Sequence, residues 1–95
     1  MTAPSETWRL FAHGHVQGVG YRAACEAQAT SLQLGGWVRN RTDGSVEVVA
    51  TGSRNQLEAL RQWMEQGPPA ARVSKVEQET LPPEVFHGFS FRETR

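Results

Sequence analysis

The chain has 95 residues, of which 38% are hydrophobic and 21% are charged, with ten Lys and Arg against ten Asp and Glu. This length and composition predict one domain built on one hydrophobic core. The net charge of zero argues against a general nucleic-acid or membrane-surface binder, because those classes usually carry a basic excess.

The cysteine content and the first residues bear on the compartment. Cys25 is the single cysteine, so it cannot form an intramolecular disulfide. The first residues lack the basic start and apolar run of a signal peptide, and no stretch approaches the ~18 apolar residues of a membrane span. We therefore expect a cytoplasmic protein.

Residues 8–16 alternate between apolar and polar positions, which predicts a strand. Trp8, Leu10 and Ala12 share one face of this strand. The glycines at positions 14, 18 and 20 then prevent a regular continuation and predict a loop.

Residues 21–34 predict a helix, because their apolar residues are spaced four, four and three apart along one stripe: Tyr21, Cys25, Ala29 and Leu32. Gly35 and Gly36 supply the expected stop just past the helix. Cys25 lies on the apolar stripe, so we expect it to be a small core residue rather than a reactive thiol.

Residues 37–39 predict a short strand, and residues 45–51 predict a second strand with Val46, Val48 and Ala50 on one face. The dipeptide Asp43-Gly44 between them is a strong hairpin signal. These two strands are therefore expected to pair in antiparallel fashion.

The second half of the chain predicts one more helix and two weaker strands. Ser53 and Gln56 form a capping-box pattern ahead of a helix that ends at Gly67. The polar residues 73–80 predict an edge strand, and residues 89–91 predict a last short strand with both phenylalanines turned inward.

The resulting order, β-α-β-β-α-β with a possible fifth strand, predicts an α+β, ferredoxin-like (split βαβ) antiparallel sheet with two helices on one face. We expect a single domain over residues 7–92, a disordered or extended N-terminus over residues 1–6, and a C-terminal tail over residues 93–95.

This topology brings two distant segments together. The first two strands run parallel with the third between them, so they lie roughly 9–10 Å apart and end at the same edge of the sheet. The glycine loop after the first strand and Asn40 at the end of the second are therefore expected to face one site, with Arg22 in the first turn of the helix.

A glycine-rich turn that leads into a helix N-terminus favours an anion, because its amide hydrogens and the helix dipole both attract negative charge. Arg22 adds a planar, bidentate donor suited to a phosphoryl group. No lysine follows Gly20, so this is not a nucleotide-binding P-loop, and the dinucleotide-binding pattern also fits poorly. The predicted phosphate-binding residues are His15, Val16, Gln17, Gly18, Val19, Gly20 and Tyr21.

Two long motifs carry a resemblance to the acylphosphatase family. Residues 14–22 read GHVQGVGYR and resemble the first family signature, and residues 36–40 read GWVRN, followed by Gly44, Ser45, Val46 and Gly52, and resemble the second. The resemblance covers nearly the whole chain. It implies that Arg22 binds the substrate phosphate and that Asn40 holds the attacking water.

The same resemblance implies a cofactor-free enzyme, with no metal, that hydrolyses acyl phosphates to a carboxylate and inorganic phosphate. We expect a monomer that binds neither nucleic acid nor membrane. The scattered histidines give no metal-ligand pattern.

Two other functions remain open at this point. The first is a non-catalytic anion- or RNA-binding module on the same fold, which requires exposed aromatic residues on the two central strands and a basic field. The second is a regulatory or carrier domain that uses the loop to hold a phosphorylated or carbamoylated partner.

Overall fold

The computed structural model describes residues 5–95, so residues 1–4 of the predicted N-terminal segment lie outside the described part. Within residues 5–95 the order is β1 (Glu6–His15), α1 (Tyr21–Ser31), β2 (Gly35–Asn40), β3 (Val46–Gly52), α2 (Arg54–Gln66), β4 (Arg72–Leu81) and β5 (Phe89–Phe91). The predicted α+β, ferredoxin-like fold is confirmed. None of the helices in these residues is long and apolar enough to cross a membrane.

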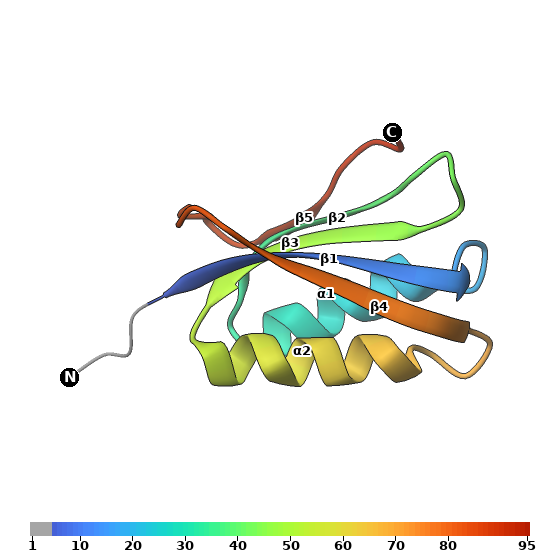
Figure 1. Cartoon of the computed structure of the whole chain (residues 1–95), viewed down its shortest axis with the longest axis horizontal. Coiled ribbons are helices and arrows are strands. Elements are labelled where there is room, and N and C mark those ends of the chain that lie inside the picture. Colours follow the sequence, from blue (N-terminus) through green and yellow to red (C-terminus); the bar gives the residue numbers. More distant parts are fainter. Residues whose placement is uncertain (1–4) are drawn as a thin grey trace.

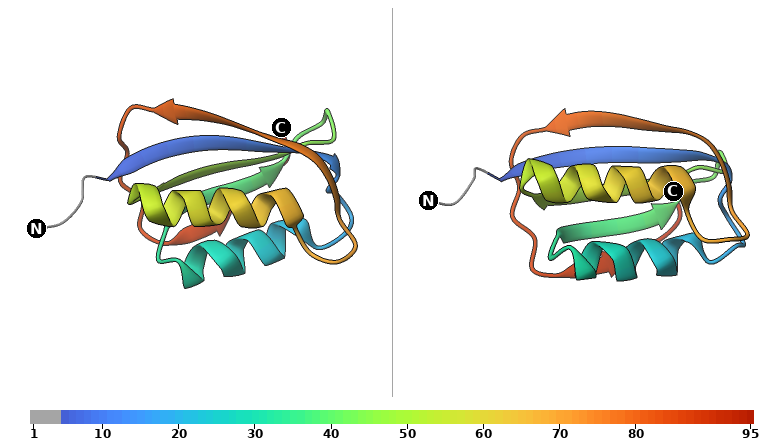
Figure 2. Two further views of the ribbon diagram at one scale, coloured as in Figure 1. Left: turned by 60° about the horizontal axis from the view of Figure 1, so that its bottom comes forward. Right: turned by 90° about the horizontal axis from the view of Figure 1, so that it is seen from below.

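The strands form one sheet in the order β4-β1-β3-β2-β5, and both helices cover the same face of it (Figures 1 and 2). The pairs β1–β4, β1–β3 and β3–β2 are antiparallel, as predicted. β5 instead pairs with β2 in parallel, so the sheet is mixed. β4 lies at an edge, in agreement with its polar sequence.

The core lies between the helices and the covered face of the sheet. Its largest members include the predicted inward residues Trp8 and Leu10 of β1, and Cys25 is fully buried. α2 buries Leu57, Leu60 and Met64, which recur at helical spacing. The predicted capping box at the start of α2 is present, with Ser53 and Gln56 each bonding the other's backbone amide.

The end of α1 differs from the prediction. The helix stops at Ser31 rather than at position 34, and Gln33 takes the left-handed conformation with φ of 62°. The amide of Leu34 then donates to the carbonyl oxygen of Ala29. Gly35 and Gly36 are therefore not the helix stop; they begin β2, where a Cβ on Gly36 would lie 1.9 Å from the carbonyl oxygen of Val49.

The last segment also differs from the prediction. Phe89 packs against the core, but the Phe91 side chain is 49% exposed, so only one of the two phenylalanines points inward. Beyond β5 the backbone stays beside β2, where the amide of Arg95 donates to the carbonyl oxygen of Asn40 at 3.2 Å. The segment 92–95 is exposed in its side chains but held by its backbone.

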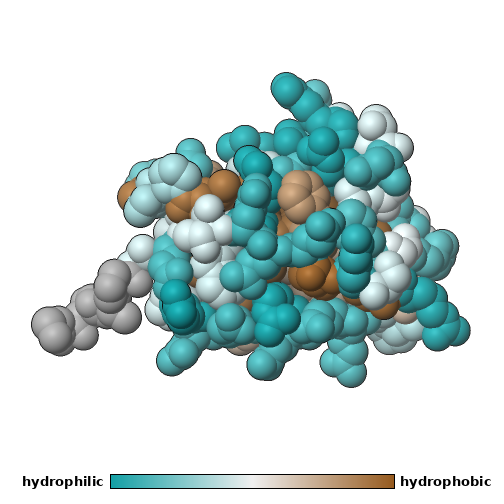
Figure 3. Space-filling view, viewed as in Figure 1, coloured by the Kyte–Doolittle hydropathy of each residue, from teal (hydrophilic) through white to brown (hydrophobic). Residues whose placement is uncertain are grey.

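The surface seen in Figure 3 is mostly hydrophilic, with hydrophobic atoms showing over the connection between β4 and β5 and again in the middle of the view. Val85 of this connection is 81% exposed. Within residues 5–95, Val85 and Phe91 are the two exposed large hydrophobic residues.

Candidate active site

The ends of β1 and β2 meet at one edge of the sheet. Both strands are antiparallel to β3, which lies between them, so they run in the same direction. Residues 16–20, which we call the glycine loop, follow β1 and lead into α1, and Asn40 is the last residue of β2. The structure thus brings together the two segments that the topology predicted to face one site.

The glycine loop presents the N-terminus of α1 in a form suited to an anion. Gly18 and Gly20 have φ of 75° and 78°, a conformation that costs other residues strain. Gly20 is the N-cap of α1 and has no side chain to cap the first-turn amides, and that first turn contains no acidic residue. The amide hydrogens and the positive end of the helix dipole are therefore available to a negatively charged group.

A side chain within the loop fixes its position. Gln17 Nε2 donates to the carbonyl oxygens of Arg41 and Ser45, at 2.8 and 2.9 Å. These carbonyls belong to the connection between β2 and β3, directly after Asn40. Gln17 therefore joins the two halves of the site through its side chain, a role that the sequence did not reveal.

The loop, α1 and β2 enclose a cavity of about 160 Å³. Its lining residues are Val16, Gln17, Gly18, Gly20, Tyr21, Arg22, Ala23, Asn40 and Phe91. Arg22 and Asn40, the two predicted catalytic residues, thus line the same cavity. Asn40 Oδ1 is buried and finds no hydrogen-bond donor among the described residues.

Phe91 is a member of this cavity that sequence reasoning missed. In β5 it pairs with Val38, two residues before Asn40, and the Arg22 guanidinium lies 5.8 Å from the centroid of its ring. The sequence signal was the short Phe-Ser-Phe segment, but its partner strand could not be deduced from local pattern. A parallel pairing between distant segments placed this ring beside Arg22.

Two of the predicted phosphate-binding residues, His15 and Val19, do not line the cavity. His15 ends β1 and is exposed, and Val19 packs against the core. The other five predicted residues all line the cavity: Val16, Gln17, Gly18, Gly20 and Tyr21. Among residues 5–95, no group of His, Cys, Asp or Glu side chains is arranged to hold a metal ion.

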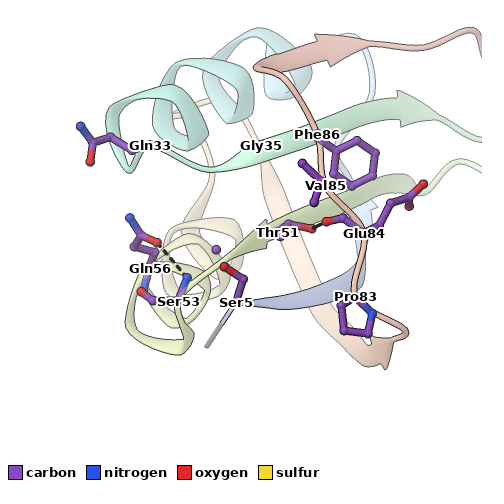
Figure 4. A pocket seen from close by; sticks show the side chains of 11 residues that line it. Ser5, Gln33, Gly35, Thr51, Ser53, Gln56, Pro83, Glu84, Val85 and Phe86 are labelled. Carbon is purple, nitrogen blue, oxygen red and sulfur yellow. Dashed lines mark hydrogen bonds between the residues drawn. The ribbon is translucent and has the colours of Figure 1, made fainter. Parts of the chain in front are cut away.

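A larger cavity of about 590 Å³ lies at the opposite end of the sheet, near the start of β2 and the end of β3 (Figure 4). Thr51, Ser53, Gln56 and Val85 are among its lining residues, and none of the lining residues is a lysine, arginine or histidine. The carbonyl oxygen of Glu84 there is already occupied by hydroxyl hydrogen bonds. This cavity offers an anion no cationic side chain.

The alternative function of RNA binding requires exposed aromatic side chains on the face of the sheet that the helices leave uncovered. On β3 it presents Glu47, Val49 and Thr51, none of them aromatic, and the first two are only 2% exposed. Trp37 of β2 is 7% exposed, with the guanidinium carbons of Arg39 and Arg92 at 4.7 and 4.6 Å from its ring centroid. Phe11 and His13 of β1 lie on the same face, but the adjacent strand β3 adds no aromatic side chain, so the described residues lack the paired aromatic positions that this kind of RNA-binding surface requires.

The comparisons with known proteins agree with this geometry. The protein-family profile described as Acylphosphatase matches residues 8–91. The chain belongs to the acylphosphatase family. It is 66% identical over 94 residues to an acylphosphatase of Cupriavidus metallidurans, a match that covers 99% of each chain.

Two solved acylphosphatases have the same fold. The enzyme of Coxiella burnetii superimposes with a TM-score of 0.89 at 39% identity, covering 93% of both chains. The Bacillus subtilis acylphosphatase gives a TM-score of 0.89 at 34% identity and covers 92% of this chain and 98% of its own. The prediction from the sequence that this chain is an acylphosphatase is thereby confirmed.

Proposed function

We propose that the chain hydrolyses acyl phosphates with Arg22 and the amides of the glycine loop holding the phosphoryl group and Asn40 orienting the attacking water. The observation that carries the proposal is the buried Oδ1 of Asn40, which lines the same cavity as Arg22 and lacks a donor among residues 5–95. A buried acceptor without a partner costs about 1–3 kcal/mol. A water molecule in the cavity satisfies it by donating one hydrogen.

The chemistry of the leaving group explains why so few side chains suffice. The carboxylate released from an acyl phosphate has a conjugate acid with a pKa of about 4, so it leaves without being protonated. The oxygen of the water attacks phosphorus as the bond from phosphorus to the acyl oxygen breaks, and the water gives up its protons to the phosphate product and solvent. No general acid is needed at the leaving oxygen.

Arg22 and the loop amides stabilise the negative charge of the phosphoryl group as it is transferred. Arg22 offers two parallel N–H groups to the equatorial oxygens, and the uncapped amides at Gly20 and Tyr21 add donors along the helix axis. Asn40 holds the water without adding a negative charge beside the phosphate. The roles therefore separate, with Arg22 acting on the phosphoryl group and Asn40 on the nucleophile.

The test is hydrolysis of benzoyl phosphate by the wild type, Asn40→Ala and Arg22→Ala, with and without EDTA. Each substitution is expected to lower the rate by on the order of 10²–10³. Inhibition by inorganic phosphate distinguishes the roles: Asn40→Ala is expected to keep the wild-type Ki, and Arg22→Ala to raise it. We expect EDTA to have no effect.

Matched controls are available outside the cavity. Asn55 is exposed on α2, and Arg54 is exposed with only a surface ion pair to Glu6. Asn55→Ala and Arg54→Ala are expected to retain wild-type turnover. Near-normal turnover by folded Asn40→Ala or Arg22→Ala would contradict the assigned roles.

A further inference from the structure

The cavity has room for a phosphoryl group and a water molecule but not for a large acyl group as well. Its volume of about 160 Å³ corresponds to roughly five water molecules at ~30 Å³ each. A phosphoryl group and the attacking water fill most of that space. The acyl part of the substrate must therefore lie at the mouth of the cavity, against whichever side chains are exposed there.

Phe91 is the large apolar side chain at that mouth. Of the other apolar residues that line the cavity, Val16 and Tyr21 are each 1% exposed, so they cannot contact a group outside it, and the exposed Ala23 offers only a methyl group. Phe91 is 49% exposed. Its ring also lines a neighbouring cavity, which shows that it stands at an opening rather than inside the core.

Backbone pairing with β2 holds the Phe91 ring close to Arg22. Its partner in the sheet is Val38, and the amide of Arg92 donates to the carbonyl oxygen of Val38 at 2.9 Å. The Arg22 guanidinium lies 5.8 Å from the ring centroid, within cation–π range. A substrate whose phosphoryl group is bound by Arg22 thus has its acyl group beside the Phe91 ring.

We infer that Phe91 is a specificity-determining residue that contacts the acyl group and favours substrates with an aromatic or other large apolar acyl group. The inference rests on the proposed function, because it takes Arg22 as the phosphoryl ligand. An exposed ring gains by packing against a second apolar surface, and aromatic pairs gain further from their preferred geometry.

The neighbouring cavity that Phe91 also lines suggests a different substrate, in which the acyl group carries a second negative charge. It is lined by Arg39, Arg92 and Arg95, but Glu93 lies there too. Arg39 already forms an ion pair with Glu47 at 2.7 Å. Arg92 stacks on Trp37. The observations therefore favour the apolar acyl group over the anionic one.

The experiment compares benzoyl phosphate, acetyl phosphate and succinyl phosphate as substrates of the wild type, Phe91→Ala, Phe91→Leu and Arg92→Gln. Phe91→Ala is expected to lower kcat/KM for benzoyl phosphate by on the order of 10-fold, mainly through KM. Turnover of acetyl phosphate and the Ki of inorganic phosphate are expected to stay within about 2-fold of the wild type. The kcat/KM of Phe91→Leu for benzoyl phosphate is expected to lie between those of the wild type and Phe91→Ala, because leucine keeps apolar area without a ring.

Val85→Ala is the matched control, since Val85 is the other exposed large hydrophobic residue among residues 5–95 and lines the cavity at the far end. It is expected to leave all the kinetic constants unchanged. An equal loss of both benzoyl and acetyl phosphate hydrolysis in Phe91→Ala, with a raised phosphate Ki, would overturn the inference and show that the ring acts only through Arg22.

Preference of the wild type for succinyl phosphate, lost in Arg92→Gln, would also overturn the inference, in favour of the anionic acyl group. These failures differ from failure of the proposed function. In that case the folded wild type would hydrolyse none of the three substrates.

Discussion

Tyr21 Oη donates a 2.7 Å hydrogen bond to the carbonyl oxygen of Met64, which ties the first residue of α1 to the last turns of α2. Both residues are almost fully buried. Tyr21 directly precedes Arg22, so this bond fixes the backbone from which the guanidinium extends. The hydroxyl faces α2 and takes no part in binding the phosphoryl group.

Tyr21→Phe is therefore expected to destabilise the fold by about 1–2 kcal/mol, because the buried carbonyl of Met64 loses its donor. The activity of the folded variant is expected to stay within a few-fold of the wild type. Urea unfolding together with benzoyl phosphate kinetics checks both parts. A loss of activity as large as that of Arg22→Ala would contradict the structural role.

The burial of Tyr21 also predicts that the stability of the fold depends on pH in the alkaline range. Desolvation, with the nearby Cys25, raises the pKa of Tyr21 far above its usual value. The unfolded chain then ionises first at this group, so the contribution of Tyr21 to stability is complete below about pH 10 and falls as the pH rises above it. Since Tyr21 is the one tyrosine of the chain, tyrosinate absorbance is expected to appear only as the protein unfolds. Tyr21→Phe should lose less stability over this range.

Gln17→Ala is expected to loosen the glycine loop, because its side-chain amide bonds two carbonyls beside Asn40. The stability loss is expected to be about 1 kcal/mol, while kcat/KM falls by on the order of 10-fold as the donors shift. Gln17→Glu is expected to be worse, since a carboxylate would face those carbonyls without a hydrogen to donate. The exposed Gln62 provides the control substitution Gln62→Ala. Unchanged kinetics in Gln17→Ala would show that the loop holds its shape without this anchor.

Glu47→Gln is expected to cost about 2–3 kcal/mol, because Glu47 is 2% exposed and accepts hydrogen bonds from Arg39 and Arg41. Arg9 adds an ion pair at 3.2 Å. Removing its charge leaves Arg39 and Arg41 without their counter-ion, whereas Arg9 keeps its ion pair with Glu79. Glu79→Gln is the matched control: Glu79 also pairs with Arg9, but its side chain is 54% exposed, so a loss below about 1 kcal/mol is expected. Equal midpoints in urea for the two variants would contradict the importance of burial.

Cys25 is expected to be unreactive in the folded protein. Burial raises the pKa of its thiol to about 12, so almost none is thiolate at neutral pH. Labelling with a thiol reagent should therefore be slow in buffer and fast in denaturant, and the one cysteine makes the signal specific. Rapid labelling under native conditions would show that the helix α1 opens locally.

Much of the fold was predictable because it rests on short-range pattern. The alternation around Leu10, the spacing that buries Cys25, and the capping box of Ser53 are all readable over a few residues. The predicted end of α1 was wrong because the helix ends through Gln33, which adopts φ of 62° although glutamine has no special freedom for that conformation. A glycine, Gly35, follows only two positions later. Close packing of Gly36 on β3 required glycine there instead.

The residues of the candidate site likewise fall into those that local sequence predicted and those that depend on long-range contacts. Arg22 and Asn40 were predicted from two local motifs and the topology, and both line the cavity. The sequence did not single out Phe91, and His15, which was predicted to bind phosphate, does not line the cavity. Neither side-chain direction nor the partner of β5 is encoded in neighbouring residues. Both depend on contacts between segments far apart in the chain.

The sequence by itself determined the order of strands and helices, the glycine loop before α1, and the presence of Arg22 and Asn40 at the ends of their elements, because periodicity and glycine content act locally. Only the tertiary structure decided that β5 lies parallel to β2, that Gln17 anchors the loop to Ser45, and that Phe91 lines the cavity. Those outcomes depend on which distant backbone and side-chain groups can be satisfied together, and that requires the whole fold at once.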